Sequence, residues 1–194
     1  MAAGLGGGSS DAAAALRLLA RANGLSLEDE RIAEAARATG ADVPVCLFRR
    51  ARMMHGIGEK LGPPLALPPL IALLVNPGAP LATKSVFARM NIATGAAAGF
   101  GRHPEICADM PAGALMAVLR KARNDMEPAA CLLAKVIGDV LAVLSAAPGC
   151  QLVRMSGSGA TCFAIFPNCR FAARARKAIL RAHPSWWTKI CVLN

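Results

Sequence analysis

The 194-residue sequence contains no tyrosine, and aromatic residues make up only 4% of it. Proteins that bind single-stranded nucleic acids stack the bases on aromatic side chains. This sequence has few aromatic residues and therefore few side chains that could stack with bases. The net charge of +10 is consistent with a nucleic-acid surface or with solvated basic faces around a pocket for anionic substrates. The basic residues at 170–181 spread around a predicted helix instead of forming one stripe. This distribution argues against nucleic acid as a partner.

Long apolar runs, leader-like segments and paired cysteines are also missing. Residues 65–75 are apolar but too short for a membrane span of about 20 residues, and Pro68 and Pro69 interrupt them. No basic segment followed by an apolar core stands at the N-terminus. The seven cysteines contain no CxxC pair, and only three histidines occur. We therefore expect reduced thiols, a cytoplasmic location, no membrane partner and no bound structural metal.

What the sequence does contain is a glycine-rich stretch, Gly4–Ser10 (GLGGGSS), followed at once by helix-forming residues. Glycine permits positive φ and lets backbone approach a ligand closely. The free N–H groups and the positive dipole end of the following helix favour anions. Ser9 and Ser10 can cap that helix or reach a phosphate or Mg²⁺. These features predict a phosphate cradle.

Two well-known phosphate-binding patterns do not fit this stretch. The Walker pattern needs a lysine after the glycines, and none is present. In the Rossmann pattern the third glycine falls on Ser9, and no strand precedes. The alternative is a flexible Gly/Ser tail. The well-patterned helix directly after the glycines favours the cradle.

The hydrophobic pattern predicts mixed helices and strands. Prolines at 63, 64, 68 and 69 form a stiff joint, so we place a domain boundary there, between residues 1–62 and 63–194. Expected helices cover 10–22, 26–39 (capped by Ser26), 114–122, 128–145 and 170–182, with a short one opened by 83–87. Expected strands cover 70–76, 151–155, 162–166 and 189–193; residues 43–47 and 48–55 look strand-like, and 91–113 form a loop.

Four chemically suggestive features have ordinary structural explanations. Asp42 suits a turn or a cap, and Asn124 suits the cap of the next helix. Phe87 suits a core aromatic on an amphipathic helix. Residues 156–161 (SGSGAT) suit a hairpin turn between two apolar strands. Residue chemistry alone leaves both the structural and the functional explanations open.

Residues 2–13 (AAGLGGGSSDAA) also resemble the ATP-binding motif of the GHMP small-molecule kinases, which include galactokinase and the homoserine and mevalonate kinases. Further segments similar to that family follow in the family's order. They are GADVP at 40–44, GIGEKL at 56–61, TKSVF at 83–87, RNDMEP at 123–128 and MSGSGA at 155–160. The resemblance therefore extends over nearly the whole chain.

The resemblance implies an α+β fold: the C-terminal part of a ribosomal protein S5 domain 2-like domain, then a ferredoxin-like GHMP kinase C-terminal domain. It implies ATP and Mg²⁺ as cofactors and a small-molecule substrate. Asp42 falls on the family's catalytic aspartate. The ATP-binding residues would be Gly4, Leu5, Gly6, Gly7, Gly8, Ser9 and Ser10. The substrate-binding residues would be Thr83, Phe87, Gly157, Ser158 and Gly159.

The GADVP and RNDMEP segments are most similar to one branch of the family. That branch phosphorylates the 2-hydroxyl of 4-diphosphocytidyl-2-C-methyl-D-erythritol in the non-mevalonate isoprenoid (terpenoid) pathway. Three alternatives stay open: another GHMP kinase of the homoserine or mevalonate type, an inactive fragment, and a basic nucleic-acid-binding module. The sequence leaves open whether the protein is a monomer or a homodimer.

The family's segment ahead of the ATP motif has no counterpart in this sequence. There the family carries its first strands, a lysine that partners the aspartate, and aromatic and histidine contacts to the cytidine. Loss of strands would leave a sheet edge and an apolar face uncovered. We therefore expect this chain to be N-terminally truncated, poorly soluble and weakly active or inactive.

Overall fold

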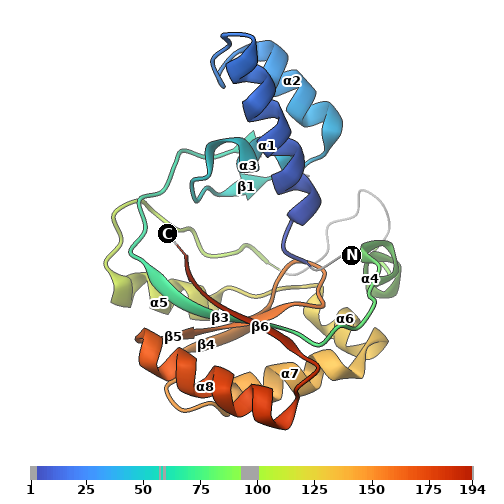
Figure 1. Ribbon diagram of the computed structural model, residues 1–194, viewed down its shortest axis with the longest axis vertical. Coiled ribbons are helices and arrows are strands. Elements are labelled where there is room, and N and C mark those ends of the chain that lie inside the picture. Colours follow the sequence, from blue (N-terminus) through green and yellow to red (C-terminus); the bar gives the residue numbers. More distant parts are fainter. Residues whose placement is uncertain (1–3, 57, 59, 93–100, 194) are drawn as a thin grey trace. The chain divides into compact units, whose positions relative to one another are not determined.

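The computed structural model describes residues 4–56, 58, 60–92 and 101–193 (Figure 1). Contacts between Cα atoms divide the chain into two compact units. The first, here the sheet unit, comprises the described residues 4–5, 68–92, 101–105 and 111–193. The second, the helical unit, comprises the described residues within 6–67 and 106–110. The chain thus crosses from one unit to the other between Leu5 and Gly6, inside the glycine-rich stretch.

Helix α1 (Gly7–Ala22) opens the helical unit and begins earlier than predicted. Its N-cap is Gly6, with φ 62°, and no side chain caps it. Ser9 and Ser10 lie within the first helical turn, so their predicted capping role is wrong. The left-handed conformation that glycine adopts without strain allows the helix to start at this point. The C-terminal end at Ala22, followed by Asn23, is as predicted.

Helix α2 (Glu30–Thr39) ends where the sequence predicts but starts later. Asp29, not Ser26, is its N-cap and accepts from the Arg31 N–H at 3.0 Å. The Arg31 guanidinium also donates to the Asp29 carboxylate, and these hydrogen bonds lower the pKa of Asp29 to about 2. Ser26 instead accepts from the Glu28 N–H at 3.2 Å in the preceding turn. A carboxylate at the dipole's positive end is the stronger acceptor.

Residues 43–48 form helix α3 (Val43–Phe48), so the predicted strand-like run is wrong. Pro44 stands in the first helical turn, where its missing N–H costs nothing. Val43 and Leu47, four positions apart, are both buried on the face that meets α1. Of the predicted β-like segment 48–55, only β1 (Met54–His55) is a strand, and it pairs antiparallel with β2 (Lys60–Leu61).

The sheet unit contains one four-stranded sheet, with the strand order β4-β5-β3-β6. These strands are β3 (Leu70–Asn76), β4 (Leu152–Met155), β5 (Cys162–Phe166) and β6 (Trp187–Leu193), and every neighbouring pair is antiparallel. The helices of the unit are α4 (Thr83–Met90), α5 (Ala112–Lys121), α6 (Glu127–Leu133), α7 (Lys135–Ser145) and α8 (Cys169–Ala182). Four antiparallel strands in this order form the predicted ferredoxin-like sheet.

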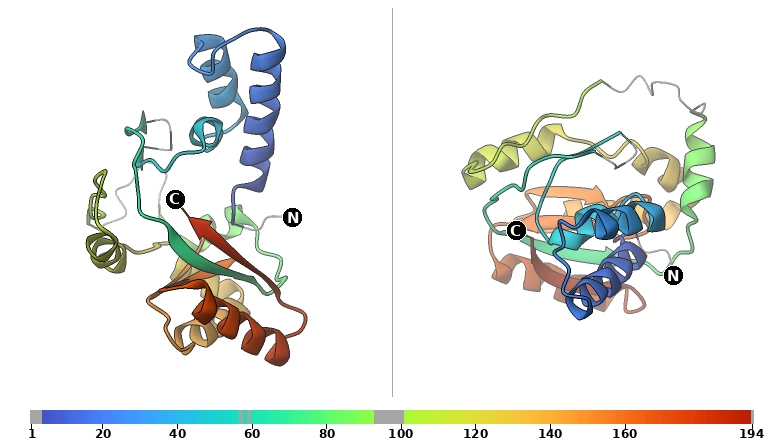
Figure 2. Two further views of the ribbon diagram at one scale, coloured as in Figure 1. Left: turned by 60° about the vertical axis from the view of Figure 1, so that its left-hand side comes forward. Right: turned by 90° about the horizontal axis from the view of Figure 1, so that it is seen from above.

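Helices α7 and α8 cover one face of this sheet (Figure 2). Alternate strand residues point into the resulting core, as a period of two requires. Leu73 and Val75 of β3, Ala164 of β5, and Ile137 of α7 are fully buried there. On the opposite face a smaller cluster joins Met116 of α5 to the strand residues Ala72, Leu152 and Ile165.

Strands β3 and β5 have the predicted bounds, whereas several helices differ. The helix predicted over 128–145 is interrupted at Ala134, with φ −139° and ψ 89°. The interruption lets α6 pack against α4 while α7 packs on β4 and β5. Helix α8 begins at Cys169 because Asn168 accepts from two N–H groups of its first turn. Of the loop predicted at 91–113, residues 93–100 lie outside the described residues, and α5 begins at Ala112.

None of the helices within the described ranges has both the length and the apolar character needed to span a bilayer.

Candidate functional site

The loop between β4 and β5, residues 156–161 (here the SGSGAT loop), is a compact turn closed by its own backbone. The Ser156 N–H donates to the Thr161 carbonyl and the Gly159 N–H donates to the Ser156 carbonyl, both at 2.9 Å. Gly157 and Gly159 have φ of 53° and 89°. A Cβ on Gly159 would lie 2.7 Å from the Met155 sulfur. The loop therefore requires glycine at these two places.

Gly4, the first described residue, packs against this loop although 152 positions separate it from Ser156. The Ser156 hydroxyl donates to the Gly4 carbonyl at 2.7 Å. A Cβ on Gly4 would lie 2.5 Å from the Ser156 carbonyl oxygen and 2.6 Å from that of Gly159. The fold thus joins the start of the glycine-rich stretch to the SGSGAT loop through a serine hydrogen bond and a close backbone approach that leaves no room for a Cβ on Gly4.

Thr83 also meets the loop, from the first residue of α4. Its hydroxyl lies 2.8 Å from the hydroxyl of Ser158, which is itself buried. Phe87 stands one helical turn further along α4 and is 56% exposed. The core-aromatic explanation for Phe87 is therefore wrong. An exposed phenyl ring on a helix whose start touches a glycine loop is available for a ligand.

Asn124 also contacts the loop through its side chain. The sequence did not predict this contact. Its amide nitrogen donates to the carbonyls of Met155, at 3.0 Å, and Gly157, at 2.8 Å. Its amide oxygen accepts from the Met126 N–H at 3.0 Å. Asn124 is not the N-cap of α6, a position that Met126 occupies. The polar run RNDMEP was the only sequence signal for this network.

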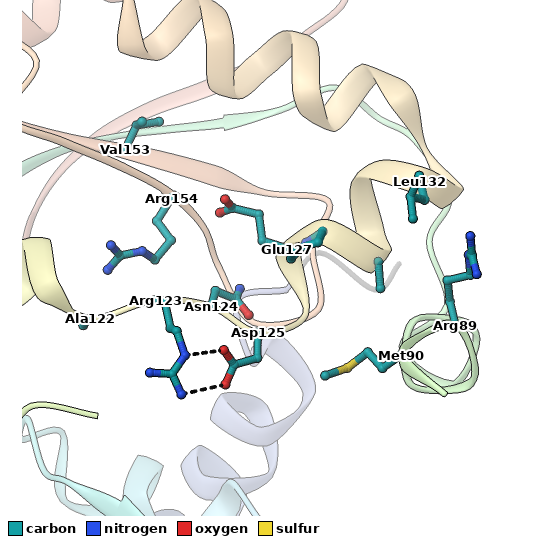
Figure 3. A pocket seen from close by; sticks show the side chains of 12 residues that line it. Arg89, Met90, Ala122, Arg123, Asn124, Asp125, Glu127, Leu132, Val153 and Arg154 are labelled. Atoms are coloured by element: carbon teal, nitrogen blue, oxygen red, sulfur yellow. Dashed lines mark hydrogen bonds and ion pairs between the residues drawn. The ribbon is translucent and has the colours of Figure 1, made fainter. Parts of the chain in front are cut away.

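A hollow of about 600 Å³ lies beside these residues, between the end of α4, residues 122–125, α6 and β4 (Figure 3). Charges of both signs line it. Arg123 and Asp125 form an ion pair, with 2.6 Å between Nε and Oδ1. Burial lowers the pKa of the Arg154 guanidinium, which donates to the Leu119 carbonyl at 3.1 Å.

In the helical unit, residues 6–8 of the glycine-rich stretch leave open space around their backbone. A Cβ on Gly6, Gly7 or Gly8 would meet no atom within 4 Å. The first intrahelical bond runs from the Ser10 N–H to the Gly6 carbonyl at 2.9 Å. The N–H groups of residues 7–9 precede it, so the helix supplies them no partner. This geometry suits an anion at the start of α1.

Asp42 is exposed and occupies the N-cap position of α3, yet its side chain makes no capping hydrogen bond. It lies in a turn, as the structural explanation required, but its carboxylate is not used for capping. Helix α3 is tied to α1 by Arg17, which donates to the Cys46 carbonyl at 2.8 Å. The Ser10 hydroxyl lies 3.8 Å from the Cys46 sulfur. The start of α1 and the helix that follows Asp42 are thus packed together.

Within the part of the chain that the structure describes, no three His, Cys, Asp or Glu side chains gather closely enough to hold a metal ion. Mg²⁺ typically keeps several waters and is bound through one or two protein ligands together with substrate phosphates. The Ser9 and Ser10 hydroxyls at the start of α1 fit that mode of binding.

Known proteins resemble this chain in sequence and fold. Residues 1–50 match the family model described as GHMP kinases N terminal domain, and residues 107–185 match GHMP kinases C terminal. A 4-diphosphocytidyl-2-C-methyl-D-erythritol kinase of Xanthobacter autotrophicus is 53% identical over 200 residues, covering 100% of this chain and 67% of the relative. The chain belongs to the GHMP kinase family. The expected resemblance is thereby confirmed.

Other relatives of this GHMP kinase agree. A protein of the same description from Methylorubrum extorquens is 54% identical over 189 residues. The alignment covers 97% of this chain and 65% of that relative, so the chain spans about two thirds of the relative's length. A crystal structure of 4-(cytidine 5'-diphospho)-2C-methyl-D-erythritol kinase superposes with a TM-score of 0.75 at 34% identity, covering 99% of this chain and 67% of that one.

A homoserine kinase from Cytophaga hutchinsonii shares the fold, with a TM-score of 0.72 at 20% identity, covering 100% of this chain and 66% of that chain. At that identity the likeness concerns the fold alone.

Proposed function

We propose that this GHMP kinase transfers the γ-phosphoryl group of ATP to the 2-hydroxyl of 4-diphosphocytidyl-2-C-methyl-D-erythritol. The observation that carries the proposal is the identity of 54% over 97% of the chain to a relative of that description. It is supported by the contacts that join Gly4, the SGSGAT loop and Thr83, since these segments would bind ATP and acceptor. The homoserine alternative has only a likeness of 20% identity in its favour, which concerns the fold alone.

ATP would bind along residues 4–10. The open N–H groups of residues 7–9 would face the phosphates, and the α1 dipole would favour their negative charge. Gly4, whose carbonyl accepts from Ser156 of the SGSGAT loop, and Leu5 would also contact ATP. Mg²⁺, held by the phosphates, water and the Ser9 or Ser10 hydroxyl, would neutralise charge on the triphosphate.

Asp42 would be the catalytic residue. Its exposed carboxylate, unused for capping, would accept the proton of the 2-hydroxyl or orient that hydroxyl. In the transfer, the acceptor oxygen forms a bond to the γ-phosphorus, the bond from that phosphorus to the β,γ-bridging oxygen breaks, and the hydroxyl proton moves to the carboxylate. A carboxylate is a weak base for an alcohol, so Asp42 would act by orienting the hydroxyl as well as by accepting its proton.

The acceptor would bind on the sheet unit. Phe87, exposed on α4, would lie against the cytosine ring. Thr83, Gly157, Ser158 and Gly159 would contact its polar groups. We further propose an ATP-binding domain at residues 1–62, a C-terminal domain at 63–194, a cytoplasmic location, and a monomer or homodimer.

The test is a product assay with the protein expressed from its own gene. Three separate reactions each contain the protein, ATP, Mg²⁺ and one acceptor. The acceptors are 4-diphosphocytidyl-2-C-methyl-D-erythritol, homoserine and mevalonate. Phosphorus NMR and mass spectrometry identify any product. We expect a phosphate monoester at the 2-position, with one ADP per product, from the cytidyl acceptor alone. Turnover of either other acceptor in its place, or ADP release without a phosphorylated product, would overturn the proposal.

A further inference from the structure

We propose that Asn124 is a positioning residue that sets the SGSGAT loop in its substrate-binding conformation by donating one hydrogen bond to Gly157 of the loop and one to Met155, the end of β4 just before it. This inference rests on the proposed function only for its consequence in catalysis, because the contacts themselves lie within the sheet unit. The ordinary alternative is that Asn124 serves the start of α6 and nothing more. The two roles use opposite ends of the same amide and can be separated.

Every hydrogen-bonding group of the Asn124 side chain has a defined partner. The two N–H bonds of the amide serve two backbone carbonyls, those of Met155 and Gly157, which lie 31 and 33 positions away in the sequence. The amide oxygen serves the Met126 N–H, two positions away. A residue that only organised the local turn would need the acceptor alone. The two donated bonds reach a different element, and both partners belong to the strand end and loop.

Met155 lies on an edge strand, so its backbone N–H and carbonyl need side chains as hydrogen-bond partners. Strand β4 stands at the end of the strand order β4-β5-β3-β6. Backbone groups that point outward from such an edge strand have no neighbouring strand to bond. The Met155 N–H donates to the Glu127 carboxylate at 2.8 Å, and its carbonyl accepts from Asn124 at 3.0 Å. These two side chains, which Figure 3 labels, take the place of a fifth strand just before the loop begins.

Continuous contacts lead from Asn124 to the residues proposed to bind substrate. The Gly157 carbonyl that Asn124 holds precedes Ser158, whose hydroxyl bonds that of Thr83 at 2.8 Å. Thr83 begins α4, the helix that carries Phe87. A Cβ on Gly157 would lie 3.3 Å from the Gly4 carbonyl, so a shift of this residue would also disturb the start of the ATP segment.

Asn124→Asp separates the two roles because it keeps the shape of the side chain and its acceptor for the Met126 N–H. It removes both donors and sets a negative carboxylate against two carbonyl oxygens. Asn124→Ala removes all three bonds but leaves room for water. The matched control is Asn168→Asp, since Asn168 caps α8 through its oxygen alone, accepting from Arg170 at 3.0 Å and Phe171 at 3.2 Å. Aspartate caps a helix as well as asparagine does.

The first readout, hydrogen exchange of the backbone amides at 155–161 without ligand, does not depend on activity. We expect exchange at Ser156 and Gly159 to be about tenfold faster in Asn124→Asp. Loss of the hydrogen bonds that Asn124 donates would raise the equilibrium constant for local opening of the loop by about that factor. Asn168→Asp should match the wild type over these residues. Unchanged exchange at 155–161 in Asn124→Asp would overturn the proposal.

The second readout is kinetic. Small displacements of a binding group cost about 100-fold in the worst cases, so we expect kcat/KM for the acceptor to fall roughly 10- to 100-fold in Asn124→Asp, mainly through KM. The fall should equal or exceed that in Asn124→Ala, and Asn168→Asp should keep its kcat/KM within about twofold. Wild-type kinetics in Asn124→Asp would overturn the positioning role. A wild type that phosphorylates homoserine or mevalonate in place of the cytidyl acceptor would instead overturn the proposed function, and the exchange result would still decide the role of Asn124.

Discussion

Taken separately, the two units hold their predicted site residues in different ways. In the sheet unit, Gly4, Thr83 and Asn124 meet the SGSGAT loop through side-chain and backbone hydrogen bonds of 2.7 to 3.0 Å. In the helical unit, the glycines at 6–8 face open space and the Asp42 carboxylate makes no capping bond. One part is fixed by the protein itself, and the other presents groups that a ligand can satisfy.

The buried cores of the two units also differ, because the side chains in the core of the sheet unit are larger. Among the described residues, the buried core cluster of the helical unit consists of Ala13, Ala20, Ile32, Ala36, Val43 and Leu47, half of them alanine. The main cluster of the sheet unit includes larger buried side chains such as Leu73, Ile137 and Leu144. Burial of apolar area stabilises a fold by about 25 cal/mol per Å². The sheet unit therefore carries more of the stability, and the helical unit more of the expected phosphate chemistry.

The largest effect should come from Asp42→Asn. Removing a positioned acid–base group lowers kcat by about 10²- to 10⁴-fold, while the ATP cradle stays intact, so KM for ATP should change by no more than about threefold. Steady-state kinetics with MgATP and the cytidyl acceptor measure both. Glu34→Gln, which removes an exposed carboxylate from α2 of the same unit, is the control and should leave kcat unchanged. Equal losses in kcat and in ATP affinity would contradict a catalytic role for Asp42.

Core truncations sharpen the comparison of stabilities. Leu73→Ala should destabilise the sheet unit by about 3–5 kcal/mol, because its large buried neighbours leave a cavity. Leu47→Ala should cost the helical unit about 2–3 kcal/mol, since small neighbours can close around the gap. Urea unfolding followed by peptide-resolved hydrogen exchange reports each unit separately. A larger loss for Leu47→Ala would reverse the ranking of the two cores.

Two glycine substitutions should have opposite effects on stability. Gly4→Ala places a Cβ 2.5 Å from a carbonyl oxygen at φ 68° and should cost about 1–3 kcal/mol. Gly8→Ala fills open space inside α1 and should stabilise the helix by about 0.5–1 kcal/mol. Both should weaken ATP binding, since Gly4→Ala would displace backbone that is proposed to contact ATP and Gly8→Ala would place a methyl group in the open space of the cradle. Thermal unfolding and ATP titration separate these effects. Full ATP affinity in Gly8→Ala would exclude residues 7–9 from the cradle.

The smallest effect concerns Cys162, a core residue of the sheet unit. Burial raises the pKa of its thiol to about 12 from 9.0. The folded state then holds the proton more tightly than the unfolded state, so this contribution to stability is complete below pH 9 and is lost as the pH approaches 12. Iodoacetamide at pH 8 should label the exposed Cys169 and leave Cys162 unmodified until urea unfolds the chain. Labelling of native Cys162 would show an open core.

The sequence predicted the strands of the sheet more accurately than the helices around the candidate site. Strands β3 and β5 have the predicted bounds because each is an apolar run between turn residues. The sequence did not predict helix α3 because Val43–Phe48 is short and apolar. Hydrophobic periodicity cannot distinguish a helix from a strand in such a run, so tertiary packing decides. The interruption at Ala134 likewise has no local sequence signal.

The site was predicted by likeness of motifs, and its geometry depends on contacts between distant residues. The bond from Ser156 to Gly4 spans 152 positions, and no local pattern encodes it. Phe87 has the helical spacing of a core residue, and its exposure follows from how α4 packs. The two donated bonds of Asn124 exist because β4 is an edge strand, which the sequence of β4 does not reveal.

Hydrogen exchange with and without MgATP tests the central claim most directly, namely that the protein itself fixes the SGSGAT loop, whereas the nucleotide supplies partners to the first N–H groups of α1. We predict that MgATP slows exchange of the amides at residues 6–11, whose first N–H groups lack helical partners, and barely changes Ser156 and Gly159, which are already bonded at 2.9 Å. Unchanged exchange at 6–11, or protection confined to 156–161, would contradict the account.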